Sequence, residues 1–404
     1  MALVVTVIVL IILATVSISS VMGDNGIIKK AQLAKNMHAN SIETEQSAMD
    51  ELLQEYANAM AEPPAPTIPT GPNGNPLTST VTVANHTGTA TEDTLGNPVY
   101  IPGGFKIASD SGSTVKEGIV IEDEAQNQFV WIPVSNINHD GSNKVKVDEN
   151  TEVEITLGRY TFDATTGAET IVQKGSEWDK TTSAIDETYK IVNSYDSSYY
   201  HYELATKMSG KNEVAKDLED FIDSVEEKHG YYIARYEASY ASGSSTADYK
   251  PASKVSTANS TSSIGYTAGT LWDYISQSDA SIVCQNMYSG DNYVESDLVN
   301  SYAWDTAIVY IQAMENSNYA NQGRGSNTSL VNTGSTGDEK CKIFDMAGNE
   351  LEWTTEYCTR SYDACCTGRG GYYGTNNMYA TYRGGSAVDF AGDGVGFRSL
   401  LYVK

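Results

Sequence analysis

Basic residues are scarce in this chain of 404 residues. Lys and Arg together number 26, against 52 for Asp and Glu, so the net charge is −26. A surface this acidic repels phosphate backbones, and we therefore expect no nucleic-acid partner. Cysteine is scarce too. None of the five cysteines forms a Cys-x-x-Cys pair or lies beside histidine at metal-ligand spacing, which argues against a zinc site.

Charge is absent from the N-terminal segment. Residues 1–22 contain no charged side chain, and Met1–Leu13 has no polar face. A helix of this kind must be buried in lipid, in a partner or in copies of itself. A secretory signal would place Lys or Arg before the apolar run. The run begins at Met1, so the segment is either an uncleaved anchor or what remains after a basic leader is removed. The residues expected in its buried core are Leu3, Val5, Val9, Ile12, Leu13 and Val16.

Two glycines end this apolar segment. Gly23 and Gly26 enclose an Asp-Asn pair, and each glycine disfavours a helix by about 1 kcal/mol, so we predict a break there. Residues 27–60 have apolar positions at helical spacing, which predicts an amphipathic helix. The prolines that begin at Pro63 end it.

The remainder divides into a linker and one large domain. Residues 62–98 are rich in Pro, Gly and Thr, which is typical of a linker. Short strand-like runs and turns begin at residue 99. We therefore predict an α+β fold with a long N-terminal helix over 1–61, the linker, and an outer domain over 99–404. Within that domain the predicted elements include a hairpin over 118–134 and helices over 213–228 and 304–314.

The N-terminal part resembles a known family. Leu3-Val4-Val5-Thr6, the aliphatic run after it, and Gly23-Asp24-Asn25-Gly26-Ile27 look like the processed N-terminus of a type IV pilin of the Gram-positive variety. The resemblance implies a helix that is held in the membrane and then packs into the core of a helical filament. One departure is that most pilins carry a glutamate near the start, where this chain offers Ala2 or Val5.

A second resemblance covers about residues 99–404. Four ordered segments carry it: Gly230–Glu237 (GYYIARYE), Phe344–Thr354 (FDMAGNELEWT), Tyr382–Ser386 (YRGGS) and Gly396–Arg398 (GFR). They are similar to the formylglycine-generating-enzyme-like (sulfatase-modifying factor) domain. The resemblance implies a loop-rich α+β relative of the C-type lectin fold.

The same resemblance argues against an enzyme. Active members of the family use two cysteines, between the last two motifs, to bind copper and activate oxygen. Here that segment, Ala387–Val395, is short and contains neither Cys nor His. Without thiolates it offers no soft site for Cu(I), so we expect no catalytic residues and no copper cofactor.

The family also places a calcium-type turn at Gly-Asn-x-x-Glu-Trp. In this chain Asn349 and Glu352 would supply the oxygen ligands, which makes calcium the one candidate cofactor. The alternative is a structural turn, in which Asn349 tolerates left-handed backbone geometry and Glu352 pairs with an arginine. The sequence favours neither.

The cysteines are candidates for disulfides, because exported thiols tend to be oxidised. They are Cys284, Cys341, Cys358, Cys365 and Cys366, and an odd number leaves one over. We predict at least one disulfide among the last four. For the adjacent pair Cys365-Cys366, the alternative to a structural disulfide is a redox role.

Taken together, the sequence predicts a structural subunit of a type IV pilus-like extracellular filament. It would form a homo-oligomer through its N-terminal helix, lie in the membrane before assembly, and expose a catalytically inactive outer domain. The alternative is an adhesin, anchored singly at the cell surface, whose lectin-like body binds a glycan or a protein. Tyrosine pairs such as Tyr372-Tyr373 would stack on sugars in that case, or pack between subunits in the first.

Overall fold

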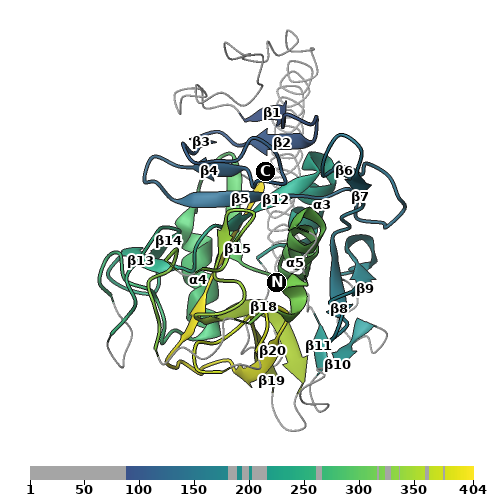
Figure 1. Ribbon diagram of the computed structural model, residues 1–404. Helices are drawn as coiled ribbons and strands as arrows, with labels where there is room; N and C mark the ends of the chain where they lie inside the picture. Colours follow the sequence, from purple (N-terminus) through teal and green to yellow (C-terminus); the bar gives the residue numbers. More distant parts are fainter. Residues whose placement is uncertain are drawn as a thin grey trace, which may run out of the picture. The chain divides into compact units, whose positions relative to one another are not determined.

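The computed structural model describes residues 88–180, 189–192, 200–202, 216–260, 266–315, 318–323, 329–335, 337–359, 364–375 and 378–404. The chain divides into two compact units, Met1–Ile68 and Pro69–Lys404, and every described residue lies in the second (Figure 1). The predicted apolar core of residues 1–22, the break at Gly23 and Gly26, and the helix over 27–60 all fall outside the described residues.

Two six-stranded sheets organise the described unit (Figure 1). Across the first sheet the order is β15 (Val294–Leu298), β22 (Ser399–Val403), β12 (Gly230–Ala234), β5 (Gln128–Pro133), β4 (Val120–Glu122) and β3 (Lys106–Ile107). Across the second it is β10 (Ile191–Val192), β11 (Tyr200–Tyr202), β18 (Leu351–Thr359), β19 (Ala364–Arg369) and β20 (Arg383–Ala387), with β21 (Val395–Phe397) parallel to β18.

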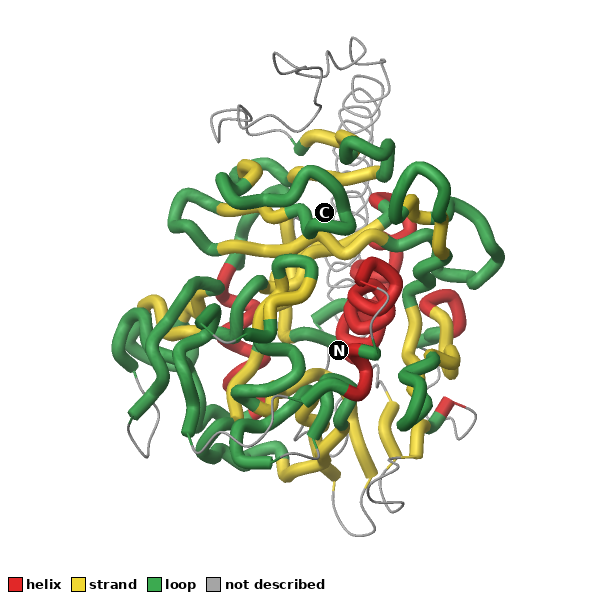
Figure 2. The backbone as a smooth tube through the Cα atoms, viewed as in Figure 1, coloured by secondary structure: helices red, strands yellow, loops and turns green. Residues whose placement is uncertain are grey.

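Five two-stranded sheets and several short helices complete the described part. The two-stranded sheets are β1 (Thr89–Glu92) with β2 (Pro98–Ile101), β6 (Val145–Lys146) with β7 (Glu152–Val153), β8 (Gly158–Phe162) with β9 (Glu169–Lys174), β13 (Ser239–Ser242) with β14 (Lys250–Ala252), and β16 (Glu339–Lys340) with β17 (Ile343–Phe344). The helices are α3 (Leu218–Lys228), α4 (Gln277–Met287), α5 (Ser301–Glu315), and the 3₁₀ turns Gly175–Glu177 and Tyr319–Asn321. Figure 2 shows how much loop joins these elements.

The predicted α+β class is wrong for the described residues, which form a mostly-β unit. They contain 22 strands but only three α-helices, none longer than 15 residues. The α+β prediction rested on the long N-terminal helix, which is not described, and on the α+β fold that the family resemblance implies for residues 99–404. In the described unit, short runs rich in Val, Ile, Thr and Tyr favour strands, because branched and aromatic side chains pack well on a pleated surface.

Local signals account for the elements that were foreseen. The hairpin predicted over 118–134 is confirmed as β4 and β5, which pair antiparallel. The helix predicted over 213–228 is confirmed as α3, which begins where the Asp217 side chain accepts the Asp220 N–H and ends at His229 in left-handed geometry. The strand β1 lies inside the stretch that the sequence assigned to the linker.

The helix predicted over 304–314 is confirmed as α5, and it lies at the centre of the unit. Every residue from 301 to 311 is buried, and such an all-round buried helix belongs in a core. It packs against β8, β5 and β18. Two hydrogen bonds tie the helix to this core: the Tyr310 hydroxyl donates to the Val115 carbonyl and the Tyr231 hydroxyl donates to the Ala303 carbonyl, both at 2.5 Å.

Strand β12 brings distant parts of the chain together. Its five residues are all buried, and it pairs with β5 on one side and with β22, near the C-terminus, on the other. A second apolar cluster, separate from the main core, forms around Trp272, Trp353 and Phe397. Strand β21 runs parallel to the start of β18, and Leu351, Glu352 and Trp353 pair with Val395, Gly396 and Phe397.

Candidate functional site

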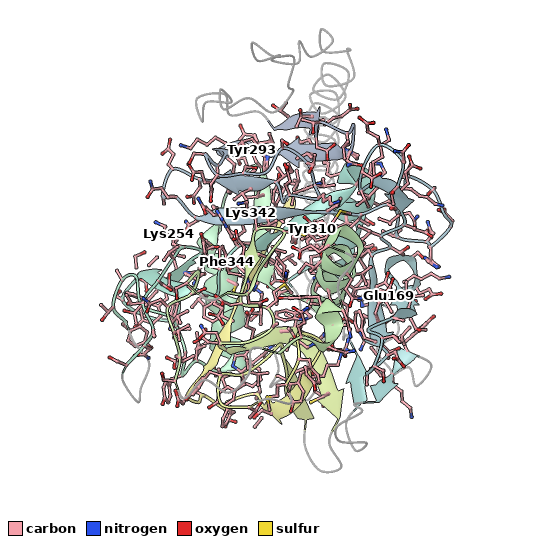
Figure 3. All side chains as sticks on the ribbon, in the orientation of Figure 1. Glu169, Lys254, Tyr293, Tyr310, Lys342 and Phe344 are labelled. Carbon is pink, nitrogen blue, oxygen red and sulfur yellow. The ribbon has the colours of Figure 1, made fainter. Side chains whose placement is uncertain are left out.

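Arg398 joins three of the four motif segments. Its Nε and Nη2 atoms donate to the two carboxylate oxygens of Glu352 at 2.9 and 2.6 Å. Its Nη1 atom donates to the Ala234 carbonyl at 2.8 Å and its Nη2 atom to the Phe344 carbonyl at 2.9 Å. Phe344 is labelled in Figure 3. Arg398 and Glu352 are both fully buried, so this two-bond ion pair holds the segments together without contact with water.

Asn349 closes the turn before β18. Its backbone φ is 73°, a left-handed conformation that asparagine adopts more readily than most residues. Its amide group donates to Glu237 Oε2 at 2.6 Å and to the Val331 carbonyl at 3.2 Å, while its amide oxygen accepts the Val331 N–H at 3.0 Å. Both ends of the side chain are therefore engaged.

These contacts match the second of the two interpretations of Asn349 and Glu352, a structural turn in which Asn349 has left-handed geometry and Glu352 pairs with an arginine. Both oxygens of Glu352 face Arg398, and the oxygen of Asn349 faces a backbone N–H. A calcium ion at these two residues would have to displace a buried guanidinium. The pair therefore does not fit the calcium-type turn that the resemblance implies.

A neighbouring carboxylate is differently placed. Glu350 is 1% exposed, its backbone N–H donates to Glu237 Oε1 at 2.8 Å, and neither of its carboxylate oxygens has a hydrogen-bond partner. Burial raises the pKa of Glu350 well above its usual range, and the charges of Asp273 and Glu352 raise it further. Burial likewise raises the pKa of Glu237.

Asp273, in the loop before α4, is another buried carboxylate whose charge acts on Glu350. Its Oδ1 atom accepts from the Asn259 side-chain amide at 2.5 Å, and its Oδ2 atom accepts the Gly394 N–H at 3.4 Å. Burial raises the pKa of Asp273 to about 6, although the bonds from Asn259 and Gly394 oppose the shift. We call Glu237, Asp273, Glu350 and Glu352 the carboxylate cluster.

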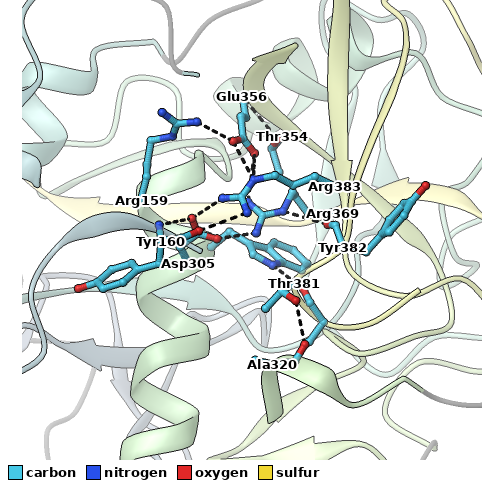
Figure 4. A network of polar contacts seen from close by, with 12 residues as sticks. Arg159, Tyr160, Asp305, Ala320, Thr354, Glu356, Arg369, Thr381, Tyr382 and Arg383 are labelled. Atoms are coloured by element: carbon cyan, nitrogen blue, oxygen red, sulfur yellow. Dashed lines mark hydrogen bonds and ion pairs between the residues drawn. The ribbon is translucent and has the colours of Figure 1, made fainter. Parts of the chain in front are cut away.

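A second buried group surrounds Glu356, four residues after Glu352 in β18 (Figure 4). It joins Arg159 of β8, Asp305 of α5, Glu356 of β18, Arg369 of β19 and Arg383 of β20, and we call it the guanidinium network. Oε1 of Glu356 accepts from Arg159 and Arg383 at 3.0 Å each, and Oε2 accepts from Arg369 at 3.1 Å. The Asp305 oxygens accept from Arg369 and Arg383.

Further contacts fix the guanidinium network to the backbone. The Tyr160 N–H donates to Asp305 at 2.8 Å, and Arg369 Nε donates to the Tyr382 carbonyl at 3.1 Å. The Arg369 guanidinium also lies over the Trp304 ring, 5.7 Å from its centre. Since every carboxylate oxygen is bonded and at most 6% of any of these side chains is exposed, the network is suited to holding elements together rather than to binding a ligand.

Aromatic side chains gather around the loop between β20 and β21, whose Gly394 N–H donates to Asp273 of the carboxylate cluster. We call Tyr274, Tyr372, Tyr373, Phe390 and Asp393 the aromatic rim. The Tyr373 hydroxyl donates to Asp393 at 2.6 Å, the rings of Tyr372 and Tyr373 lie 4.5 Å apart, and Phe390 is 46% exposed. A Cβ added at Gly394, whose φ is +65°, would lie 2.6 and 2.7 Å from the two tyrosine rings, so the turn passes close beneath them.

The cysteines occupy several environments. Cys358 is disulfide-bonded, and the backbone of Cys365 lies opposite it in the antiparallel register of β18 and β19. Cys366 is a buried thiol, and Cys284 and Cys341 are free and buried. Burial raises the pKa of Cys284 and Cys341, the latter to about 12, so neither is a reactive thiolate near neutral pH.

Other features of the described unit offer less chemistry. An open, polar pocket of about 620 Å³ is lined by side chains of both signs, including Lys116, Glu117 and Glu315. Within the described ranges, no three or more His, Cys, Asp or Glu side chains are grouped so that they would hold a metal ion. Nor is any helix in that part of the chain long and apolar enough to cross a membrane.

Sequence reasoning named Asn349 and Glu352 but missed Glu237, Asp273 and Glu350. Glu237 ends one of the motif segments and Glu350 lies within another, so membership of a motif was the signal that could have identified both. Asp273 carried no such signal. Its charge acts on Glu350 because the loop before α4 contacts Gly394, just before β21, and β21 runs beside the start of β18.

Comparisons with known proteins give weak similarities. No family model matches the chain, and no curated protein matches it. Among solved structures, CarF is similar at 15% identity and a TM-score of 0.30, covering 43% of this chain and 87% of its own. Treponema denticola variable protein 1 is similar at 13% identity and a TM-score of 0.27, covering 42% and 95%. At these TM-scores neither similarity assigns a function.

Proposed function

We propose that this chain is a structural subunit of a type IV pilus-like extracellular filament. The observation that carries the proposal is the charge-free segment of residues 1–22 joined to a body whose charge brings the whole chain to −26. Such a segment is stable in water only when it is covered, and copies of the same segment can cover it. It lies in the membrane before assembly and packs against its neighbours afterwards.

The described unit then faces outward and does not act as an enzyme. Two features support this part of the proposal. The segment Ala387–Val395 has no thiol or imidazole for a metal, and its turn instead carries Phe390 and Asp393 of the aromatic rim. The carboxylates of the guanidinium network and the carboxylate cluster are buried and accept hydrogen bonds, apart from the carboxylate of Glu350.

The first experiment substitutes Val9 with Asp. Burying an unpaired carboxylate among apolar neighbours is strongly unfavourable, so we expect the variant to abolish polymers in electron micrographs and in sedimentation. Val255→Asp is the matched control, because Val255 is 63% exposed and the same chemical change there adds only surface charge. Normal filaments from Val9→Asp would refute the proposal.

The alternative, a singly anchored adhesin, is favoured by one observation. The aromatic rim contains an exposed Phe390, the close ring pair of Tyr372 and Tyr373, and the Asp393 carboxylate, and aromatic faces with polar neighbours are suited to stacking on sugars. On a glycan array, Phe390→Ala would abolish a genuine signal, whereas Tyr266→Ala, an exposed tyrosine in another ring cluster, would leave it unchanged. A glycan signal without polymers would favour the adhesin over the filament.

A further inference from the structure

We propose that an acidic groove of the described unit binds lysine side chains from the N-terminal part of a neighbouring subunit. The groove consists of two open pockets, of about 620 and 670 Å³, which share Lys116, Glu117 and Glu315 in their lining. Its occupant is the stretch of residues 25–42 of a second copy of this chain. This inference rests on the proposed filament, and it names a contact between subunits in addition to the apolar core.

The pocket of about 670 Å³ combines a buried apolar side with an exposed charged side. Its apolar residues include Met314 and Val147, which are 2% and 7% exposed. A lysine side chain matches this arrangement, because its aliphatic stem packs on apolar surface while its ammonium group stays near charged partners. The charged residues of the pocket are all exposed, and they are Lys116, Glu117, Asp148, Glu149 and Glu315.

Most of the negative charge of this pocket has no counter-charge. Among the described residues, Glu315 pairs with Lys340 at 2.8 Å, whereas the other three carboxylates of the pocket form no ion pair. With the Lys116 ammonium group included, four carboxylates face two ammonium groups, which leaves a net charge of −2. A cationic side chain from outside is therefore attracted, and salt weakens the attraction because the groups are exposed.

Local structure keeps the pocket negative. The Ser113 N–H donates to Glu117 Oε2 at 2.7 Å, and the Asn150 N–H donates to Asp148 Oδ1 at 2.8 Å. These bonds lower the pKa of both carboxyl groups, so both are ionised at neutral pH. Glu315 is the last residue of α5, where the helix dipole places partial negative charge, and the last turn of α5 contains no basic residue.

One stretch of the sequence has the complementary charge. Residues 25–42 contain Lys29, Lys30 and Lys35 but neither Asp nor Glu, and no other run of 18 residues in the chain has a net charge of +3. The stretch follows directly after the apolar segment of residues 1–22. Packing of that segment against its copies therefore also brings the lysines of each copy among the neighbouring subunits.

Repulsion between subunits gives this contact a role in assembly. Each subunit carries a net charge of −26, and bodies of like charge repel one another when they come together. A contact between the acidic groove of one subunit and the lysines of another offsets part of this repulsion. It also fixes which face of the body meets its neighbour, since like charges disfavour other arrangements.

The test uses the full-length chain, dissolved in a non-ionic detergent and assembled by removing the detergent. One variant reverses the charge of the lysine stretch, with Lys29→Glu, Lys30→Glu and Lys35→Glu. Another reverses the charge of the groove, with Glu117→Lys and Glu149→Lys. Each variant alone should raise the critical concentration for assembly, measured by sedimentation, by roughly tenfold, because like charges then meet.

A control and a mixture sharpen this experiment. The control carries Glu124→Lys and Glu226→Lys, at two exposed carboxylates outside both pockets, and should stay within about twofold of the wild type. An equal mixture of the lysine variant and the groove variant should recover assembly. In the mixture, the acidic groove of one variant meets the lysines of the other, and the basic groove meets the glutamates.

The outcomes separate this inference from the proposed function. If the wild-type chain forms no polymers, the filament is wrong and this contact is wrong with it. If the wild type polymerises and the lysine variant does so at the same concentration, the filament stands and the contact does not exist. A mixture that assembles no better than its two components would also overturn the contact between copies.

A variant that fails to fold leaves a second measurement on the wild type. Carbodiimide joins carboxylates to amines that are in direct contact. Filaments assembled from unlabelled and ¹⁵N-labelled chains should yield linked peptides of mixed isotope, in which residues 25–42 are joined to Glu117, Asp148 or Glu149. Linked peptides that join other segments, with none of this kind, would overturn the proposal.

Discussion

Two neighbouring groups along β18 show two ways of burying charge. Around Glu356, the guanidinium network sets three arginines around Glu356 and Asp305, and all four carboxylate oxygens accept hydrogen bonds. At the start of β18, the carboxylate cluster gathers four acidic residues with one ion pair among the described residues, between Glu352 and Arg398, and Glu350 is left without a hydrogen bond to its side chain. The first arrangement is closed by protein atoms alone, whereas the second is not. Closure is expected of a structural brace, and an open carboxylate is expected of a binding site.

The largest effect should come from opening the guanidinium network. Glu356→Gln keeps the shape of the side chain but removes one of the two carboxylates that hold three buried arginines. Removing one partner of a buried ion pair typically destabilises by about 3–5 kcal/mol. We expect a loss of that order in urea unfolding. Glu339→Gln is the control: its side chain is 43% exposed, its ion pairs are long, and its loss should be below about 1 kcal/mol.

Equal effects from Glu356→Gln and Glu339→Gln would break the comparison. They would mean that the guanidinium network contributes no more to the free energy of unfolding than a surface ion pair. The elements would then be held together mainly by apolar contacts, such as the packing of α5 on β8.

The carboxylate cluster should also make stability depend on pH, with a definite sign. The folded-state pKa of Asp273 is about 6, above its usual value of 3.8. A carboxyl whose pKa is raised by folding contributes stability that is present below pH 3.8 and is lost as pH rises through 6. The shift of about two units corresponds to about 3 kcal/mol. Asp273→Asn should remove that part of the gain in stability between pH 7 and pH 4, measured by urea unfolding in chelator.

Asp248 supplies the contrast for this measurement. Hydrogen bonds from Ser244 and Ser245 lower the pKa of Asp248 to about 2, so its contribution changes only below the tested range. Asp248→Asn should leave the dependence between pH 4 and pH 7 as in the wild type. If Asp273→Asn also leaves it unchanged, Asp273 is not a source of the pH response.

The sequence predicted local structure better than it predicted the site. The hairpin at β4 and β5 and the helices α3 and α5 followed from strand-like runs around a turn and from helical spacing, which are properties of neighbouring residues. Helix α4 was missed, since its Ser, Asp, Gln and Asn residues give a weak helical pattern. The mostly-β character of the described residues was missed because the α+β class was taken from the expected N-terminal helix and from the family resemblance of residues 99–404.

The candidate site depended on contacts between distant residues. Asn349 and Glu352 were noticed because they belong to a motif, but their partners Val331, Glu237 and Arg398 could not be assigned from spacing. Asp273 lies 121 residues from Gly394, whose N–H it accepts. Such pairs are produced by the order of strands in a sheet, here by the parallel pairing of β21 with β18, and no local pattern reports it.

The smallest expected effect is also the sharpest test of the comparison, since it differs in sign between two neighbours. In chelator at pH 7, Glu350→Gln replaces a buried carboxylate without partners by a neutral group of the same shape, which should stabilise the fold by about 1 kcal/mol. Glu352→Gln makes the identical change two residues along, but it leaves the buried Arg398 uncompensated and should destabilise by about 3 kcal/mol. Urea unfolding of the two variants measures both signs. If both variants are destabilised to the same extent, Glu350 has a partner in the folded protein, and the contrast between a closed network and an open cluster does not hold.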